Sequence, residues 1–95
     1  MASTFGSYFK DLRQRKGWTL RRFCGATGFD PGNISRLERG VSSPPKSQRK
    51  LREYAKALAL KKGSKEWLGF FDRAAAAHRQ LTRAKDFNEL HRPRR

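Results

Sequence analysis

The chain is poor in acidic residues, in cysteine and in long apolar segments. Its one cysteine, Cys24, excludes an internal disulfide and a zinc site made of several cysteines. No apolar run approaches the roughly 20 residues that a membrane-spanning helix needs, and we expect no membrane partner. The N-terminus also lacks the basic and apolar segments of a signal peptide, so we expect the protein to be cytoplasmic.

The shortage of acidic residues leaves a large positive charge. The 95 residues include 23 Lys and Arg but 8 Asp and Glu, which gives a formal net charge of +15 at pH 7. A charge of this size predicts a polyanionic partner, which is a nucleic acid, an anionic membrane surface or an acidic protein. The alternative is an ordinary solvated basic surface.

The length and the apolar content predict one small domain. The composition is 36% hydrophobic and includes seven Phe, two Trp and two Tyr, which is enough for a single core. We expect this domain over residues 1–81 and a basic, frayed tail over residues 82–95. An extra helical turn around residues 87–90 is the alternative for part of that tail.

Apolar spacing and capping residues predict an all-α fold of five helices, and no segment shows the alternation of a strand. Thr4 (or Ser3) and Thr19 are suited to cap the first two helices, and Asp30-Pro31 is a typical helix start. The expected helices span residues 4–16, 19–27, 31–39, 46–60 and 65–81. The side chains expected in the core of the first four are Phe5, Phe9, Leu12, Leu20, Phe23, Cys24, Ile34, Leu37, Leu51, Tyr54, Ala55 and Leu58.

The most informative segment runs from Trp18 to Gly40 and reads W-T-L-R-R-F-C-G-A-T-G-F-D-P-G-N-I-S-R-L-E-R-G. It predicts two short amphipathic helices joined by a glycine-centred turn. Two patterns, I-x-x-L-R-x-x-x-G-x-T and L-A…G…I-S-x-L-E-x-G, are filled by Phe9, Leu12, Arg13, Gly17 and Thr19, then by Phe23, Cys24, Gly28, Ile34, Ser35, Leu37, Glu38 and Gly40. Over residues 5–60 the chain therefore resembles the lambda-repressor-like helix-turn-helix family, also called the Xre or Cro/repressor family. Two positions depart from it: Cys24 replaces alanine, and Leu20 replaces a glutamine that contacts phosphate.

The resemblance implies sequence-specific binding of double-stranded DNA by a transcriptional regulator. The simplest regulator is a repressor that binds a palindromic operator as a dimer. The family's usual base readers correspond to Pro31, Gly32, Asn33 and Arg36.

The residues themselves agree with this placement. If Ile34 and Leu37 face inward, Asn33 and Arg36 project, and Asn and Arg pair bidentately with adenine and guanine. Gly32 then permits close approach to the groove floor. The alternatives are a merely solvated helix face, or an Arg36 that contacts phosphate alone.

Two further groups have expected roles. By the resemblance, Arg13 and Glu38 form a structural ion pair between the first and third helices. Phosphate contacts are expected from the start of the second helix, from the end of the third and from the loop and helix that follow, where oriented N-terminal amides also suit an anion. These residues are Thr19, Arg21, Arg22, Arg39, Ser42, Ser43, Lys46 and Arg49.

The expected fifth helix carries a broad apolar face. Trp67, Phe70 and Phe71 are predicted to lie in a two-fold dimer interface, with Trp67 or Phe71 at its centre. Leu68 and Ala74 extend the same apolar face. The alternative is that this face closes the core of the monomer.

Other functions compete with the simple regulator. The first is the antitoxin of a toxin–antitoxin pair, which would bind a toxin protein and regulate its own operon. A general coat for RNA or DNA fits the charge but does not require helix-turn-helix spacing. An enzyme is least favoured, because the chain has no phosphate-binding glycine loop and its histidines, His78 and His91, lack metal-ligand spacing. We expect no cofactor and no metal, and we expect His78 on the solvated side of the fifth helix.

Overall fold

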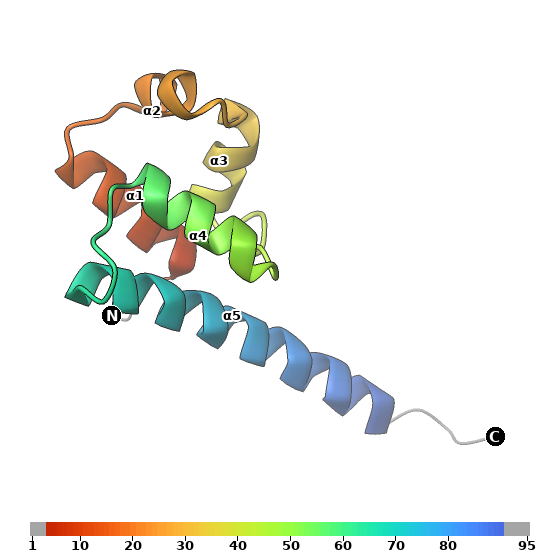
Figure 1. Ribbon diagram of the computed structural model, residues 1–95. Helices are drawn as coiled ribbons and strands as arrows, with labels where there is room; N and C mark the ends of the chain where they lie inside the picture. Colours follow the sequence, from red (N-terminus) through yellow and green to blue (C-terminus); the bar gives the residue numbers. More distant parts are fainter. Residues whose placement is uncertain (1–3, 91–95) are drawn as a thin grey trace.

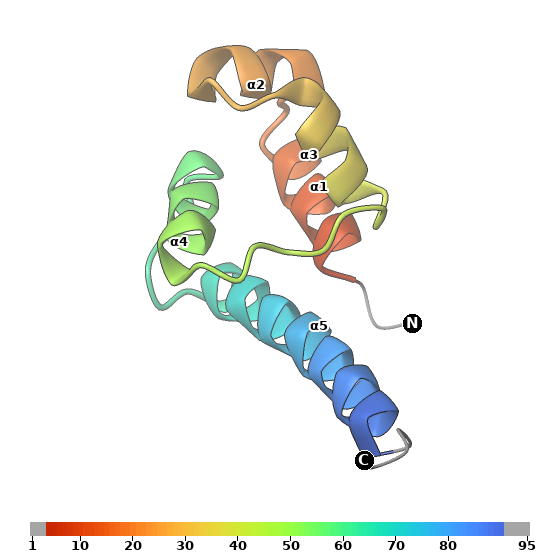
Figure 2. The same ribbon diagram turned by 90° about the vertical axis from the view of Figure 1, so that its right-hand side faces the viewer.

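The computed structural model describes the backbone of residues 4–90 and the side chains of residues 4–79. Within that part of the chain five helices form and no strand does: α1 (Phe5–Arg15), α2 (Leu20–Thr27), α3 (Pro31–Glu38), α4 (Gln48–Ala57) and α5 (Lys65–Leu90). The first four fold around one core, and α5 passes along one side of them and extends beyond them (Figures 1 and 2). The predicted all-α fold of five helices is confirmed. No described helix is both long and apolar enough to cross a membrane.

Local chemistry sets where the first four helices begin. Each starts at a side-chain oxygen that accepts a hydrogen bond from a backbone N–H three residues later, and these N-caps are Thr4, Thr19, Asp30 and Ser47. The shortest of these bonds runs from the Asn33 amide to Asp30 Oδ2, at 2.9 Å. Caps of this kind contribute about 1 kcal/mol each relative to alanine.

Two helices differ in length from the sequence prediction. α4 is shorter, because Ser47 caps its start and Ala59, just past its end, adopts a left-handed φ of 56°. α5 is longer and continues to Leu90 instead of ending near Leu81. Residues 82–90 contain no glycine or proline that would interrupt a helix. They are helical, whereas the sequence predicts a frayed tail there. The rest of that tail, residues 91–95, lies outside the described residues.

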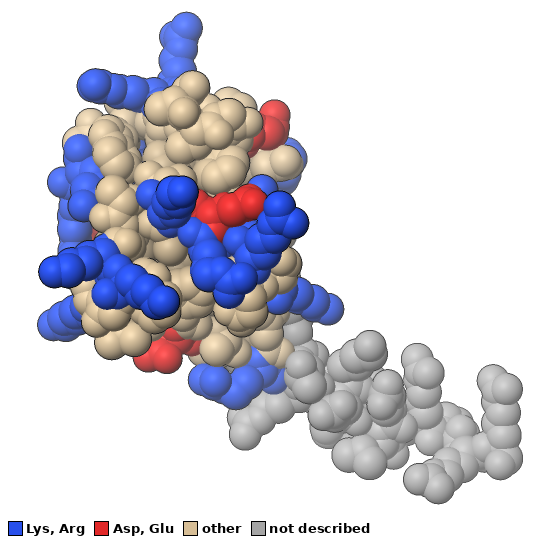
Figure 3. Space-filling model, in the orientation of Figure 1, with Lys and Arg blue, Asp and Glu red and all other residues tan. Residues whose placement is uncertain are grey.

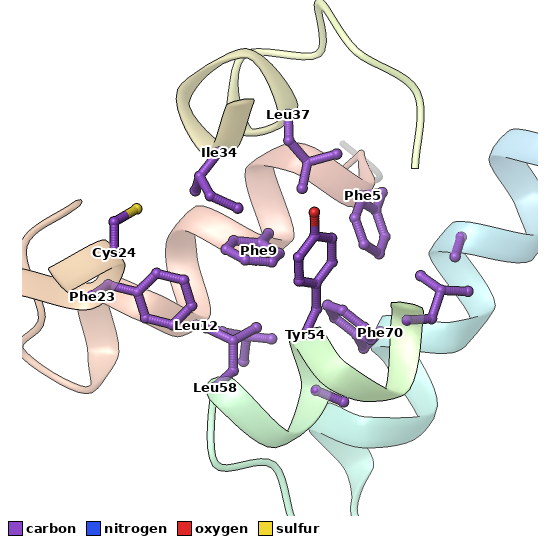
Figure 4. Close-up of a cluster of buried hydrophobic side chains, with 13 residues drawn as sticks. Phe5, Phe9, Leu12, Phe23, Cys24, Ile34, Leu37, Tyr54, Leu58 and Phe70 are labelled. Carbon is purple, nitrogen blue, oxygen red and sulfur yellow. The ribbon is translucent and has the colours of Figure 1, made fainter. Parts of the chain in front are cut away.

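The core is built around the ring of Phe9, which has no exposed surface. Figure 4 shows it between the side chains of α3 and those of α4 and α5. Its ring centroid lies 5.8 Å from that of Phe23, 5.5 Å from Tyr54 and 6.2 Å from Phe70. Of the side chains predicted to be inside, only Leu20 is half-buried, and the other eleven of the twelve are buried.

The fifth helix joins this core through Phe70 and Ala74. Phe70 is fully buried, and its ring centroid lies 4.9 Å from that of Phe5. Phe70 therefore has no surface to present to a second subunit, which corrects its place in the predicted dimer interface. Trp67 and Phe71 are half-buried with ring centroids 4.5 Å apart, and Leu68 is 52% exposed.

Two other side chains complete the packing around α2. The indole of Trp18 stacks on Phe23, with 6.1 Å between ring centroids and 27° between planes. Cys24 is buried, and this burial raises the pKa of its thiol. A thiol kept neutral in this way packs as a small apolar side chain, which is how Cys24 replaces the alanine of the resembling family.

Candidate nucleic-acid interface

Helices α2 and α3 are joined by a tight turn that begins at Gly28. Gly28 has a φ of 81°, a left-handed conformation that glycine adopts without strain, and its amide donates to the Cys24 carbonyl at 2.8 Å. Two residues later Asp30 caps α3, and Pro31 occupies its first turn. In both ribbon views α2 lies on the opposite side of the globule from α5 (Figures 1 and 2).

Helix α3 has one buried face and one free face. Ile34 and Leu37 are buried in the core at 0% and 4% exposure. The four predicted base readers are all exposed: Pro31, Gly32, Asn33 and Arg36. The sequence places both sets on the correct faces, since residues three apart share one side of a helix.

The exposed face of α3 holds two internal hydrogen bonds. Arg36 Nη2 donates to Asn33 Oδ1, so that the two polar side chains predicted to read bases are joined to each other. Arg39, at the end of the helix, donates from Nε to the Ser35 carbonyl at 3.3 Å. The guanidinium of Arg36 thus points toward the start of α3, and that of Arg39 lies along its last turn.

The ion pair of Arg13 and Glu38 locks α1 to the C-terminal end of α3. Arg13 Nε donates to Glu38 Oε2 at 2.8 Å and Nη2 donates to Oε1 at 3.0 Å, in a bidentate pair. The third interaction runs from Nη1 to the Trp18 carbonyl at 2.7 Å. Only 6% and 5% of the two side chains are exposed. The hydrogen bond with Glu38 raises the pKa of the Arg13 guanidinium, against the opposing effect of burial, so the guanidinium stays charged.

The residues predicted to contact phosphate are all at the surface. Basic side chains project over much of the face in Figure 3, and acidic ones interrupt them in a few places. The predicted set comes from α2, from the end of α3, from the α3–α4 loop and from α4, and each member is exposed: Thr19, Arg21, Arg22, Arg39, Ser42, Ser43, Lys46 and Arg49. Arg49 lies 3.8 Å from Glu53, an exposed contact that leaves it available to an anion.

Sequence reasoning did not single out Lys50. Its Nζ lies over the rings of Phe29 and Tyr54, 5.0 and 5.2 Å from their centroids, and 3.5 Å from Glu53. Lys50 therefore links α4 to the turn between α2 and α3. The position depends on an aromatic ring of the α2–α3 turn and one of α4 coming together in the fold, and nothing in the local sequence signals it.

The prediction for His78 is wrong: the side chain is part-buried and does not lie on the solvated side of α5. Its Nε2 lies 2.9 Å from the Pro45 carbonyl, and because a carbonyl only accepts, Nε2 carries the proton. Nδ1 is buried and has no hydrogen-bond partner among the described residues. His78 thus ties the loop that carries Ser42, Ser43 and Lys46 to the fifth helix. The described residues bring together no group of three or more histidine, cysteine or acidic side chains that could hold a metal ion.

Comparison with known proteins covers this same region. The profile of a helix-turn-helix domain family matches residues 4–68, more than half of the chain. The HTH-type transcriptional regulator SutR of Escherichia coli (strain K12) is 39% identical over 44 residues, which are 46% of this chain and 25% of that regulator. The chain therefore aligns with about a quarter of the length of this relative. No solved structure gives a significant match. These matches agree with the resemblance read from the sequence, and the chain belongs to the helix-turn-helix domain family.

Proposed function

We propose that the chain binds double-stranded DNA in a sequence-specific manner and regulates transcription in the cytoplasm as a repressor. One observation carries the proposal: α3 buries Ile34 and Leu37 while its polar face stands free of the protein. A recognition helix needs this division, because its outer side chains must reach base edges in the major groove. The relative SutR is named as a transcriptional regulator, which supports the same role here.

Two surfaces divide the work of binding. Asn33, in the first turn of α3, and Arg36, whose guanidinium is directed back toward that turn, are both exposed and are the proposed base-reading side chains. The basic and hydroxyl side chains around them are the proposed phosphate contacts, which hold the register of the protein on the duplex. Pro31 and Gly32 add no long side chain and let the helix approach the groove closely.

Selection of bound sequences from a random DNA library, followed by salt titration, tests this division. With about six phosphates neutralised per subunit, we expect log K to fall with log salt at a slope of about −5.

Arg36→Ala should relax preference at one base pair, whereas Lys46→Ala should weaken binding to all sequences alike and reduce the slope by about 1. Equal affinity for random and selected DNA would instead indicate a non-specific coat, and a flat salt series would exclude the phosphate contacts.

A two-fold dimer would place two recognition helices on the two halves of a palindrome, about 34 Å apart. The proposed interface is the surface of α5 formed by Trp67, Leu68 and Phe71, because Leu68 is 52% exposed beside two half-buried aromatic rings. Apolar side chains that cluster on one exposed face favour association of identical subunits.

Analytical ultracentrifugation at tens of micromolar tests the dimer. We expect a dimeric mass for the natural chain and a monomeric mass for Leu68→Glu, because the dimer would bury an unpaired carboxylate in an apolar interface. Val41→Glu is the matched control, since Val41 is 66% exposed but lies outside α5, and this variant should remain dimeric. A monomeric mass for the unchanged chain at these concentrations would refute the interface.

The antitoxin function shares this DNA-binding surface and differs in what covers α5. In that case Trp67, Leu68 and Phe71 would contact a toxin protein in place of a second copy of the chain. A toxin-sized reading frame beside the gene would favour it, and a monomer that becomes a heteromer with that product would establish it.

A further inference from the structure

The two proposed polar base-reading side chains, Asn33 and Arg36, are hydrogen-bonded to each other. Arg36 Nη2 donates to Asn33 Oδ1 across one turn of α3. Both side chains are exposed, so neither requires this hydrogen bond to replace lost contacts with water. A guanidinium only donates, so the oxygen of the amide must be the atom that faces it. The orientation of the Asn33 amide is therefore set by Arg36, and its Nδ2 is left to donate elsewhere.

The surroundings of the guanidinium also direct it toward the start of the helix. A Cβ on Gly32 would lie 3.6 Å from Nη1 and 3.8 Å from Nη2 of Arg36, so the guanidinium lies over the backbone of this glycine. The Asp30 carboxylate oxygen Oδ2 lies 3.1 Å from the same Cβ position on Gly32. It accepts a hydrogen bond from the backbone N–H of Asn33. Gly32, which leaves room for the guanidinium, and Asn33, which accepts its hydrogen bond, together direct Arg36 toward the N-terminal end of α3.

The chemistry of this group favours a base edge over phosphate. The Asp30 carboxylate lies on the same side of Gly32 as the guanidinium, and a negative charge there would repel a phosphate but is compatible with the neutral edge of a base. With the amide oxygen engaged, the remaining N–H groups of Arg36 and Asn33 are all donors. Guanine offers two acceptors in the major groove, O6 and N7, whereas adenine offers one acceptor and one donor.

We propose that Asn33 is a positioning residue that holds Arg36 for bidentate readout of guanine, and that it does not read adenine on its own. This inference rests on the proposed DNA-binding function. It predicts that each half-site contains one guanine whose recognition requires both residues.

The test is a double-mutant cycle on the DNA sequence selected by the natural protein. The readout is the ratio of dissociation constants for guanine and adenine at the base pair where Arg36→Ala relaxes preference. We expect a ratio of about 10 to 100 for the natural chain, a value near 1 for Arg36→Ala, and a several-fold lower ratio for Asn33→Ala than for the natural chain. Asn33→Ala should have no further effect on this ratio when Arg36 is already alanine, because the two residues act as one unit.

Two more variants separate positioning from other roles. Asn33→Asp keeps an oxygen for Arg36 and should preserve the guanine ratio, although its charge weakens binding to every sequence. Arg39→Ala is the control, since it removes an exposed, proposed phosphate contact at the end of α3; it should weaken binding to both sequences alike and leave the ratio unchanged. All three positions are exposed, and circular dichroism checks that each variant folds.

Failure of this inference differs from failure of the proposed function. If Asn33→Ala relaxes preference for an adenine at a separate base pair, with effects that add to those of Arg36→Ala, Asn33 reads independently and the inference is overturned. If the natural chain binds selected and random DNA equally, the proposed function itself is wrong.

Discussion

Substitution of Arg13 by methionine is expected to destabilise the domain by about 3–5 kcal/mol. The change removes the guanidinium that pairs bidentately with Glu38 and leaves a carboxylate with 5% side-chain exposure without its counter-charge. It also removes the donor that satisfies the Trp18 carbonyl. Urea unfolding followed by circular dichroism at pH 7 measures the free energy of unfolding directly.

Arg15 provides a matched control on the same helix. It pairs with Asp11 at 2.7 Å, but the two side chains are 63% and 49% exposed, so water already screens the interaction. Arg15→Met should change stability by no more than about 0.5 kcal/mol. The double variant Arg13→Met with Glu38→Leu should recover much of the loss, because no unpaired charge remains buried. A cost below about 1 kcal/mol for Arg13→Met alone would show that Glu38 reaches water in the folded state.

The substitution Gly6→Ala is expected to lower the free energy of unfolding by about 1–3 kcal/mol, although alanine is the better helix former. Gly6 is buried in α1 against the end of α3. An ideal Cβ there would lie 2.1 Å from the Leu37 carbonyl oxygen and 2.9 Å from that of Glu38. Backbone atoms cannot turn aside as a side chain can, so α1 and α3 would have to separate. The measurement is again urea unfolding.

The chain also contains the opposite case. Gly25 lies in α2, and a Cβ there would meet nothing within 4 Å. Gly25→Ala should therefore stabilise the domain by about 0.5–1 kcal/mol, which is the ordinary helix preference for alanine. If both glycine variants were stabilised, α1 and α3 would not be in the close contact described here.

Much of this fold is predictable because the information is local. The starts of α1, α2 and α3 follow from single capping residues, and the two faces of α3 follow from the spacing of Ile34 and Leu37. The Arg13–Glu38 contact joins residues 25 positions apart, and only the resemblance to a known family proposes it.

What sequence reasoning missed depends on tertiary contacts. The periodicity of α5 marks Trp67, Phe70 and Phe71 alike as apolar. Which of them turns inward depends on how the helix rests against α1, and the structure selects Phe70. The hydrogen bond of His78 requires the path of a loop more than 30 residues earlier in the chain. No local pattern reveals that Gly6 is needed for a close helix contact.

The two tryptophans lie in different parts of this structure. Trp18 stacks on Phe23 of α2, and Trp67 lies against Phe71 within α5. Intrinsic fluorescence from Trp18 alone, in a Trp67→Phe chain, thus monitors the α2 region, while Trp67 alone monitors α5. Comparing these two emission signals during refolding separates formation of the recognition region from the docking of the last helix, without any added dye.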